Sequence, residues 1–247
     1  MKLEGKVAII TGSSRGIGHG IAEGFIKEGA RVAICGSTLE SANKGAEDLK
    51  NSYPNADIFA VELNVAETAS VAAGMKAVVD HFGSLDVLVN NAGIAIGGTI
   101  AEISEETFLK IQNVNVTGTF RCIKEATKYM ATNGGSIINV ASINGVYGSP
   151  RNSAYATSKS AVIGLTKSLG RELGGLKIRV NAITPGLIET DMVSVLPEET
   201  KARLIAMTPV GRSGETSDLA GICTLLASDE SSFITAAIFA VDGGAVL

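Results

Sequence analysis

Seven short aliphatic runs, separated by longer stretches of helical periodicity, constrain the fold of this chain most strongly. Each run is nearly continuous in Val, Ile, Leu and Ala, as expected for parallel strands that helices cover on both faces. The alternation of strand and helix is typical of a doubly wound α/β sheet with right-handed crossovers. The predicted strands cover residues 7–10, 31–35, 58–61, 85–89, 136–140, 178–182 and 237–241. The predicted helices cover residues 17–29, 39–51, 67–82, 104–131, 153–173 and 216–228.

The length of 247 residues suits one α/β domain, and no linker, repeat or change of composition marks a second one. We therefore expect a single domain over residues 1–247. The least regular region is 185–212, which contains three prolines and a short helical piece near 198–206. Its irregularity and its late position predict a flap over a ligand site.

Composition and charge exclude several functional classes. The chain has 21 Lys and Arg against 25 Asp and Glu, and no basic run stands out, so we expect no nucleic-acid partner. A membrane span needs about 18 apolar residues in succession, and no such run occurs. Cys35, Cys122 and Cys223 are widely separated, which favours reduced thiols and a cytoplasmic location over a disulfide framework.

A glycine-rich turn follows the first predicted strand and leads directly into a helix. Its sequence from residue 11 to residue 18 is TGSSRGIG. Gly12 permits the tight turn, Gly16 permits close approach of a pyrophosphate, and Gly18 permits close packing of the helix on the strand. The N-terminus of the helix supplies free N–H groups and a partial positive charge to phosphates. The turn therefore predicts a dinucleotide site.

Two other motifs that resemble this turn fit less well. A nucleotide P-loop ends in Gly-Lys followed by Ser or Thr, which this turn lacks. A hydrolase elbow with Ser14 as nucleophile needs a histidine late in the chain, but the only histidines are His19 and His81. Since His, Cys and carboxylate residues do not cluster at ligand spacing, we also predict no catalytic metal.

The end of the second predicted strand distinguishes NAD from NADP, because an acidic residue there binds the ribose hydroxyls and repels a 2′-phosphate. The strand ends in Gly36-Ser37-Thr38, without an acid. Arg15 of the glycine turn could reach the same corner, and the two hydroxyls are further donors. NADP(H) is therefore favoured over NAD(H). The alternative is that Arg15 is solvated and Ser37 caps the next helix, and the nearby Glu40 disfavours a phosphate.

Tyr155 and Lys159 lie four residues apart at the start of a predicted helix, so they share one face. An ammonium about 4 Å from the phenol contributes roughly 4 kcal/mol at an effective dielectric constant of about 20. Lowering the tyrosine pKa by about two needs only ~2.7 kcal/mol, so Lys159 is sufficient to make the phenol a proton donor. Ser142 follows the fifth strand, where ligands bind. Asn115, in mid-helix between two valines, is typical of a buried hydrogen-bond hub.

Taken together, these residues resemble the short-chain dehydrogenase/reductase family along essentially the whole chain. The matching features are the glycine turn, Asn90 to Gly93, Asn115, Ser142, Tyr155 with Lys159, Pro185-Gly186 and Val241 to Gly244. The resemblance implies a Rossmann-type seven-stranded parallel sheet, a nicotinamide cofactor and the catalytic residues Asn115, Ser142, Tyr155 and Lys159. It implies hydride transfer with Tyr155 as proton donor, Ser142 polarising a carbonyl and Lys159 lowering the tyrosine pKa. Asn115 would hold a water that links Lys159 to solvent.

The resemblance also implies a set of dinucleotide-binding residues. One of them, Asn64, replaces an aspartate that is common in the family, and its amide oxygen can still accept from adenine. A second departure, at residues 234–237, replaces a Thr-Gly run and affects local packing. The implied cofactor-binding residues are Gly12, Ser14, Arg15, Gly16, Ile17, Gly18, Ser37, Asn64, Val65, Asn91, Ala92, Gly93, Tyr155, Lys159, Pro185, Gly186, Ile188 and Thr190.

The substrate class stays open between two similar subfamilies, the 3-oxoacyl-acyl-carrier-protein reductases and the bacterial hydroxysteroid dehydrogenases. Two arginines that dock the carrier protein in the first subfamily align with Asn133 and Leu176, so a carrier-protein partner is possible but not favoured. Alternatives are a sugar or polyol dehydrogenase using NAD(H), and a non-catalytic dinucleotide-binding sensor or scaffold. Helices 104–131 and 153–173 resemble the family's interface in a homotetramer with 222 symmetry. A hydrophobic ketone or alcohol is favoured because the expected substrate neighbours are mostly apolar: Ile94, Ala95, Ile96, Ile143, Asn144, Tyr147, Leu187 and Met192.

Overall fold

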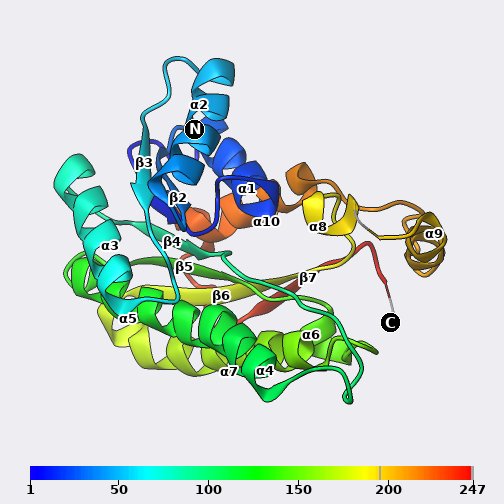
Figure 1. Cartoon of the computed structure of the whole chain (residues 1–247). Helices are drawn as coiled ribbons and strands as arrows, with labels where there is room; N and C mark the ends of the chain where they lie inside the picture. The colour runs from blue at the N-terminus through cyan, green and yellow to red at the C-terminus, as the bar shows by residue number, and fades with distance from the viewer. Residues whose placement is uncertain (195, 246–247) are drawn as a thin grey trace.

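A computed structural model describes residues 1–194 and 196–245, apart from the side chain of Met192. Its centre is a sheet of seven parallel strands in the order β3-β2-β1-β4-β5-β6-β7 (Figure 1). The order reverses between β1 and β4, which confirms the predicted Rossmann-type doubly wound topology. The strands are β1 Val7–Ile10, β2 Arg31–Gly36, β3 Ile58–Glu62, β4 Val87–Asn90, β5 Gly135–Val140, β6 Ile178–Pro185 and β7 Ile238–Val241.

Helices cover both faces of the sheet, as the continuous aliphatic strands require. Successive residues of β1 point to opposite faces. Ala8 and Ile10 pack with α1 (Gly16–Lys27), α2 (Leu39–Ser52) and α10 (Thr216–Ala227), whereas Val7 and Ile9 pack with α3 (Thr68–Phe82) and α5 (Gly118–Met130). All four residues are fully buried. The main helices are α1 Gly16–Lys27, α2 Leu39–Ser52, α3 Thr68–Phe82, α4 Glu105–Gln112, α5 Gly118–Met130, α7 Ser153–Glu172 and α10 Thr216–Ala227.

The predicted elements are confirmed with small changes at their ends. β6 continues to Pro185, three residues past the predicted end at 182, because Thr184 and Pro185 still pair with β7. The predicted helix 104–131 is α4 and α5 joined by a π-helical turn, Asn113–Thr117. Two short helices were missed, α6 Asn144–Tyr147 and α8 Asp191–Ser194. Both have only four residues, which is too short for a periodic pattern.

The irregular region 185–212 begins at the carboxyl end of β6 and carries α8 and α9 Glu198–Ala206 (Figure 1). Its base is tied by two backbone hydrogen bonds, from Glu189 N to Gly214 O at 2.8 Å and from Gly214 N to Leu187 O at 2.8 Å. The segment therefore begins and returns at the carboxyl ends of the strands, where ligands bind in such sheets. Within the described residues, no helix combines the length and apolar character that crossing a membrane requires.

Candidate active site

The glycine turn between β1 and α1 is held in place by the end of β4. The Asn91 amide donates to Thr11 O at 2.9 Å and to Gly12 O at 3.0 Å. The Thr11 hydroxyl in turn accepts from the backbone of Asn91 and of Ala92. A Cβ on Gly18 would lie 2.5 Å from Asn91 Nδ2, so this close packing requires glycine. Asn91 and Ala92 thus fix the conformation of the turn through hydrogen bonds to Thr11 and Gly12.

The front of the turn fits a dinucleotide pyrophosphate. Arg15, which precedes α1, makes no capping hydrogen bond with its side chain, so the first amides of the helix remain free for an anion. Gly16 has a φ of +60°, and a Cβ there would point to Thr190 Cγ2 at 3.6 Å. Glycine therefore keeps open a narrow space between the turn and the base of the flap, as a close phosphate contact requires. Ser14 and Ile17 are partly buried in the same turn.

At the corner expected to bind the adenosine ribose, the helix cap differs from the alternative given above, and the direction of Arg15 differs from the prediction. Thr38 rather than Ser37 caps α2, since its hydroxyl accepts from Ser41 N at 3.2 Å. Arg15 extends to the flap, where its guanidinium lies 3.5 Å from the Asp191 carboxylate. Ser37 is exposed and free of that capping role. The predicted hydroxyls are therefore present at the corner, but Arg15 points elsewhere.

Asn64 and Val65 follow β3, where the adenine contact was predicted. Asn64 Oδ1 accepts from Ala66 N at 3.1 Å, and its amide donates to Glu67 Oε1 at 2.9 Å. An amide oxygen has two lone pairs, so Oδ1 keeps one for a further donor. Val65 is buried. The predicted adenine contact of Asn64 is thus compatible with this geometry.

Tyr155, Lys159 and Ser142 meet at the carboxyl end of β5. Lys159 of α7 is 5% exposed, and its ammonium donates to Val140 O, the last residue of β5, at 2.7 Å. The same nitrogen lies 5.6 Å from the centroid of the Tyr155 ring. Ser142 comes two residues after Val140 and is buried. The structure therefore brings these three predicted catalytic side chains together, and the fourth, Asn115, adjoins Lys159 next to Gly93.

The electrostatics of this group differ from the sequence prediction. Burial raises the pKa of Tyr155, and a hydrogen bond with Ser142 opposes that rise. Burial also lowers the pKa of Lys159 from 10.5 to about 8. The expected lowering of the tyrosine pKa by Lys159 is therefore not found in this structure, because loss of water is the largest influence on both groups and Ser142, not Lys159, acts to lower the pKa of Tyr155.

Asn115 confirms the prediction of a buried hub. It lies in the π-helical turn between α4 and α5 and is 1% exposed. Its Oδ1 accepts from Ile94 N, and its Nδ2 donates to Ile94 O and to Ser158 Oγ, each at 2.9 Å. Its backbone oxygen accepts from the Thr119 hydroxyl at 2.8 Å. Asn115 thus connects the loop after β4 to α7.

Ser158 is a site residue that the sequence reading missed. It is fully buried, and its hydroxyl donates to Tyr155 O at 2.7 Å while accepting from the Asn115 amide. It therefore links the predicted hub to the helical turn that carries Tyr155 and Lys159. The sequence contains one indication of this role, which is the position of Ser158 directly before Lys159. A serine in a helix is usually solvated, so only the tertiary contact with Asn115 reveals the role.

The segment from Pro185 to Thr190 borders the same group. Ile143 N donates to Pro185 O at 3.1 Å, so this segment lies beside the loop that carries Ser142. Gly186 N donates to Val241 O at 3.1 Å, and Ile188 is buried. Gly93 also lies here, since a Cβ on it would be 3.2 Å from Asn115 Oδ1 and 3.6 Å from Lys159 Nζ. The predicted site residues that follow β4, β5 and β6 therefore lie next to one another.

The predicted substrate neighbours differ in exposure. Ile96 is 39% exposed and Tyr147 is 55% exposed, so both present apolar surface to solvent. Ile143 is buried, and Ile94, Ala95, Asn144 and Leu187 are partly buried. The side chain of Met192 lies outside the described residues.

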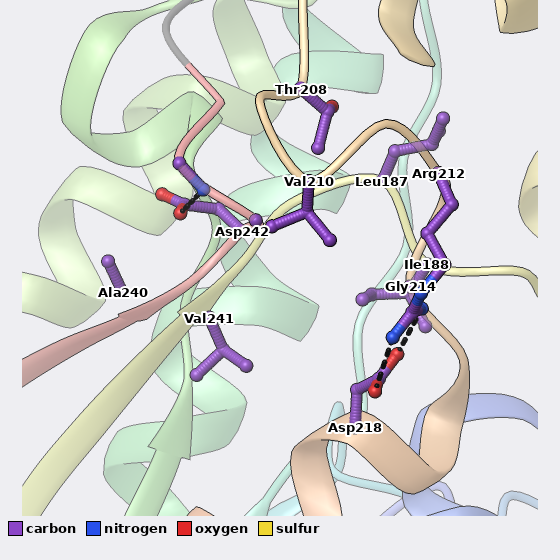
Figure 2. A pocket seen from close by; sticks show the side chains of 12 residues that line it. Leu187, Ile188, Thr208, Val210, Arg212, Gly214, Asp218, Ala240, Val241 and Asp242 are labelled. Atoms are coloured by element: carbon purple, nitrogen blue, oxygen red, sulfur yellow. Dashed lines mark hydrogen bonds and ion pairs between the residues drawn. The ribbon is translucent and has the colours of Figure 1, made fainter.

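A cavity of about 440 Å³ lies at the base of the flap, next to the predicted nicotinamide segment (Figure 2). Leu187 and Ile188 line one side, and Val241 to Gly244 line another. Arg212 and Asp218 pair at one end, with hydrogen bonds of 2.6 and 2.9 Å (Figure 2). Ser142, Tyr155 and Lys159 do not line it, so it is distinct from the catalytic group. In residues 1–194 and 196–245, no three His, Cys, Asp or Glu side chains are grouped to hold a metal ion.

Comparisons with known proteins agree with this geometry. A family model described as enoyl-(acyl carrier protein) reductase matches residues 12–246. The chain is 46% identical to a 3alpha-hydroxysteroid dehydrogenase of Mediterraneibacter gnavus, over 99% of this chain and 98% of the relative. It is 40% identical to a 3-oxoacyl-[acyl-carrier-protein] reductase of Thermotoga maritima, over the full length of both.

A solved structure from Sinorhizobium meliloti, described as a short-chain alcohol dehydrogenase, superposes with a TM-score of 0.93. It is 33% identical, and the match covers 98% of this chain and 97% of that one. A family model that covers residues 12–246 and two full-length relatives at 46% and 40% identity agree with the fold. This chain is therefore an oxidoreductase that belongs to the short-chain dehydrogenase/reductase family.

Proposed function

We propose that this protein transfers hydride between NADP(H) and a hydrophobic ketone or secondary alcohol. The observation that carries the proposal is the meeting of Ser142, Tyr155 and Lys159 at the end of β5, beside the segment from Pro185 to Thr190. A bound nicotinamide supplies or accepts the hydride. The pyrophosphate of the coenzyme would be held by Gly16, Thr190 and the free amides of α1.

In the proposed reduction, the Tyr155 hydroxyl gives its proton to the carbonyl oxygen of the substrate. Ser142, whose hydroxyl acts to lower the pKa of that phenol, orients and polarises the same oxygen. Lys159 is the positive charge of the group, and a charge in a buried site stabilises the phenolate that remains. Asn115 and Ser158 hold the helical turn that carries both side chains. In the oxidation of an alcohol, the same groups act in reverse.

The preference for NADP(H) is supported by the absence of an acid at the end of β2 and by the exposed hydroxyls of Ser37 and Thr38. Arg15 is the cation available to a 2′-phosphate. Its pair with Asp191 is solvent-exposed, with 79% and 75% of the two side chains accessible, and pairs of this kind are weak. A coenzyme phosphate can therefore replace Asp191 as the partner of Arg15.

The apolar substrate is supported by the exposed surface of Ile96 and Tyr147 and by the two relatives, one named for a hydroxysteroid and one for a 3-oxoacyl carrier protein. We favour a free hydrophobic substrate over one presented by a carrier protein. Asn133 and Leu176, at the positions aligned with the docking arginines, carry no positive charge for an acidic partner. We further propose that the flap, residues 185–212, covers this substrate.

Turnover of a panel of ketones and alcohols, followed by absorbance of the reduced coenzyme with NADP(H) and with NAD(H), tests the proposal. The panel should include hydroxysteroids, 3-oxoacyl thioesters, sugars and polyols. Tyr155→Phe should lower kcat by about 10² or more, the usual contribution of a general acid, while changing the affinity for NADPH by no more than a few fold. Tyr53→Phe is the matched control, because Tyr53 ends α2 away from this site and its hydroxyl donates to Glu23 Oε1. Binding of NADPH without turnover of any compound would instead favour a sensor or scaffold, and activity only on sugars with NAD(H) would favour the polyol alternative.

We also propose a cytoplasmic homotetramer with 222 symmetry. The assembly is supported by exposed apolar side chains on α4 and α5, Leu109 at 55% and Phe120 at 46%. A monomer in sedimentation would contradict it. The location is supported by Cys35, Cys122 and Cys223, which are buried free thiols.

A further inference from the structure

Glu62 brings a carboxylate to the corner between β2 and α2. It is the last residue of β3, and its register partner is Gly36, the last residue of β2. Its Oε2 accepts from Leu39 N, the first residue of α2, at 3.2 Å. The carboxylate therefore stands beside Ser37 and Thr38, where the chain passes from β2 into α2.

This corner is where doubly wound sheets distinguish the two coenzymes. An acid there accepts hydrogen bonds from the ribose hydroxyls and repels a 2′-phosphate. The strand that usually carries this acid, β2, ends here in Gly36 and is followed by Ser37. Glu62 reaches the corner from the neighbouring strand, so the position is acidic although the β2 sequence is not.

Hydrogen bonds already occupy two of the first three backbone amides of α2. Leu39 N bonds to Glu62, and Ser41 N bonds to the Thr38 hydroxyl. A phosphate at this helix end would therefore face a carboxylate rather than a set of free amides. The nearby cation, Arg15, pairs with Asp191. The charges around the corner thus oppose a 2′-phosphate more than the sequence alone indicates.

We propose that Glu62 is a specificity-determining residue that restrains the preference for NADP(H). Its carboxylate accepts from the adenosine ribose of NAD(H) and repels the 2′-phosphate of NADP(H). The proposal rests on the proposed function, in that the glycine turn and this corner bind a nicotinamide dinucleotide. It makes coenzyme selectivity a balance between the attraction of Arg15 and the repulsion of Glu62.

The variant Glu62→Gln tests the charge while keeping an oxygen that can accept from Leu39 N. Dissociation constants for NADH and NADPH are measured by calorimetric titration without substrate, so the result does not depend on turnover. We expect the ratio of the NADH constant to the NADPH constant to rise about fivefold, the effect of one unit-charge pair at short range in water. Raising the ionic strength from about 0.01 M to about 1 M should reduce the difference between variant and parent, because salt screens exposed charges.

Glu47→Gln is the matched control. Glu47 is exposed on the same helix, and eight residues from Leu39 correspond to about 12 Å. This control makes the same change in net charge away from the corner and should leave the ratio unchanged. A ratio for Glu62→Gln that equals that of Glu47→Gln overturns the inference, as does a fivefold change that is insensitive to salt. If both coenzymes bind but no substrate is turned over, the proposed reaction fails while the role of Glu62 is still decided by the ratio. If neither coenzyme binds the parent chain, both proposals fail.

Discussion

Replacing Lys159 by methionine should stabilise the folded chain at neutral pH while it removes activity. Lys159 is 5% exposed, and burial lowers its pKa from 10.5 to about 8. The folded chain therefore binds this proton less tightly than the unfolded chain does. A group whose pKa falls on folding in this way destabilises the fold wherever both states are protonated.

The sign and size of the effect follow from linkage. Between pH 8 and 10.5, the unfolded chain holds a proton on Lys159 that the folded chain has released, so the free energy of unfolding rises with pH. Below pH 8 both states are protonated, and the full penalty remains, roughly 3 kcal/mol for the interval between the two pKa values. Methionine has a similar length and no charge, so it removes the penalty. It also loses the hydrogen bond to Val140 O, which costs about 1 kcal/mol.

We therefore expect Lys159→Met to raise the free energy of unfolding at pH 7 by about 2 kcal/mol. At pH ~10 the advantage should disappear, because most of the parent's penalty has gone there. The chain has no tryptophan, so urea unfolding is followed by circular dichroism, at one fixed protein concentration. Lys167→Met, an exposed position on the same helix, should change stability by no more than ~0.5 kcal/mol.

Two results would refute this reasoning. The first is a Lys159→Met variant that is no more stable than the parent at pH 7. The second is an advantage that stays constant from pH 7 to pH ~10, since that would come from packing rather than from the titration of Lys159. In either case turnover should still be lost, because Lys159 is the cation beside Tyr155.

The remaining predictions concern Ser158 and Ala236. Ser158→Ala removes a buried acceptor of the Asn115 amide, so the free energy of unfolding should fall by about 1–3 kcal/mol and the pH profile of kcat should shift. Ser160→Ala, whose exposed hydroxyl donates to Gly145 O, should change neither quantity. An unchanged pH profile in Ser158→Ala would show that Ser158 has no part in positioning Tyr155. Ala236 has a φ of 60°, a left-handed conformation that costs a residue with a Cβ about 1 kcal/mol. Ala236→Gly should therefore raise the urea midpoint, and a lower midpoint would contradict this strain.

Much of the fold follows from local pattern. The continuous aliphatic runs predicted all seven strands, because a parallel strand covered on both faces must be apolar at successive positions. The glycine turn was also predictable, since the tight passage from β1 into α1 is set by neighbouring residues. Tyr155 and Lys159 share a helix face for the same reason, and the structure places both beside the end of β5. Short α6 and α8 left no periodic signal and were missed.

The finer features of the site depend on contacts between segments far apart in the chain. The turn of Arg15 toward Asp191, the arrival of Glu62 at the end of β2 and the bond from Asn115 to Ser158 have no counterpart in local sequence. The burial that changes the pKa values of Lys159 and Tyr155 is likewise a property of the packed molecule. Periodicity encodes which face of an element is apolar and therefore determined the layers of this protein. The partner and the dielectric surroundings of each polar group were decided only when the layers packed, because electrostatic energies depend on distances through space rather than along the chain.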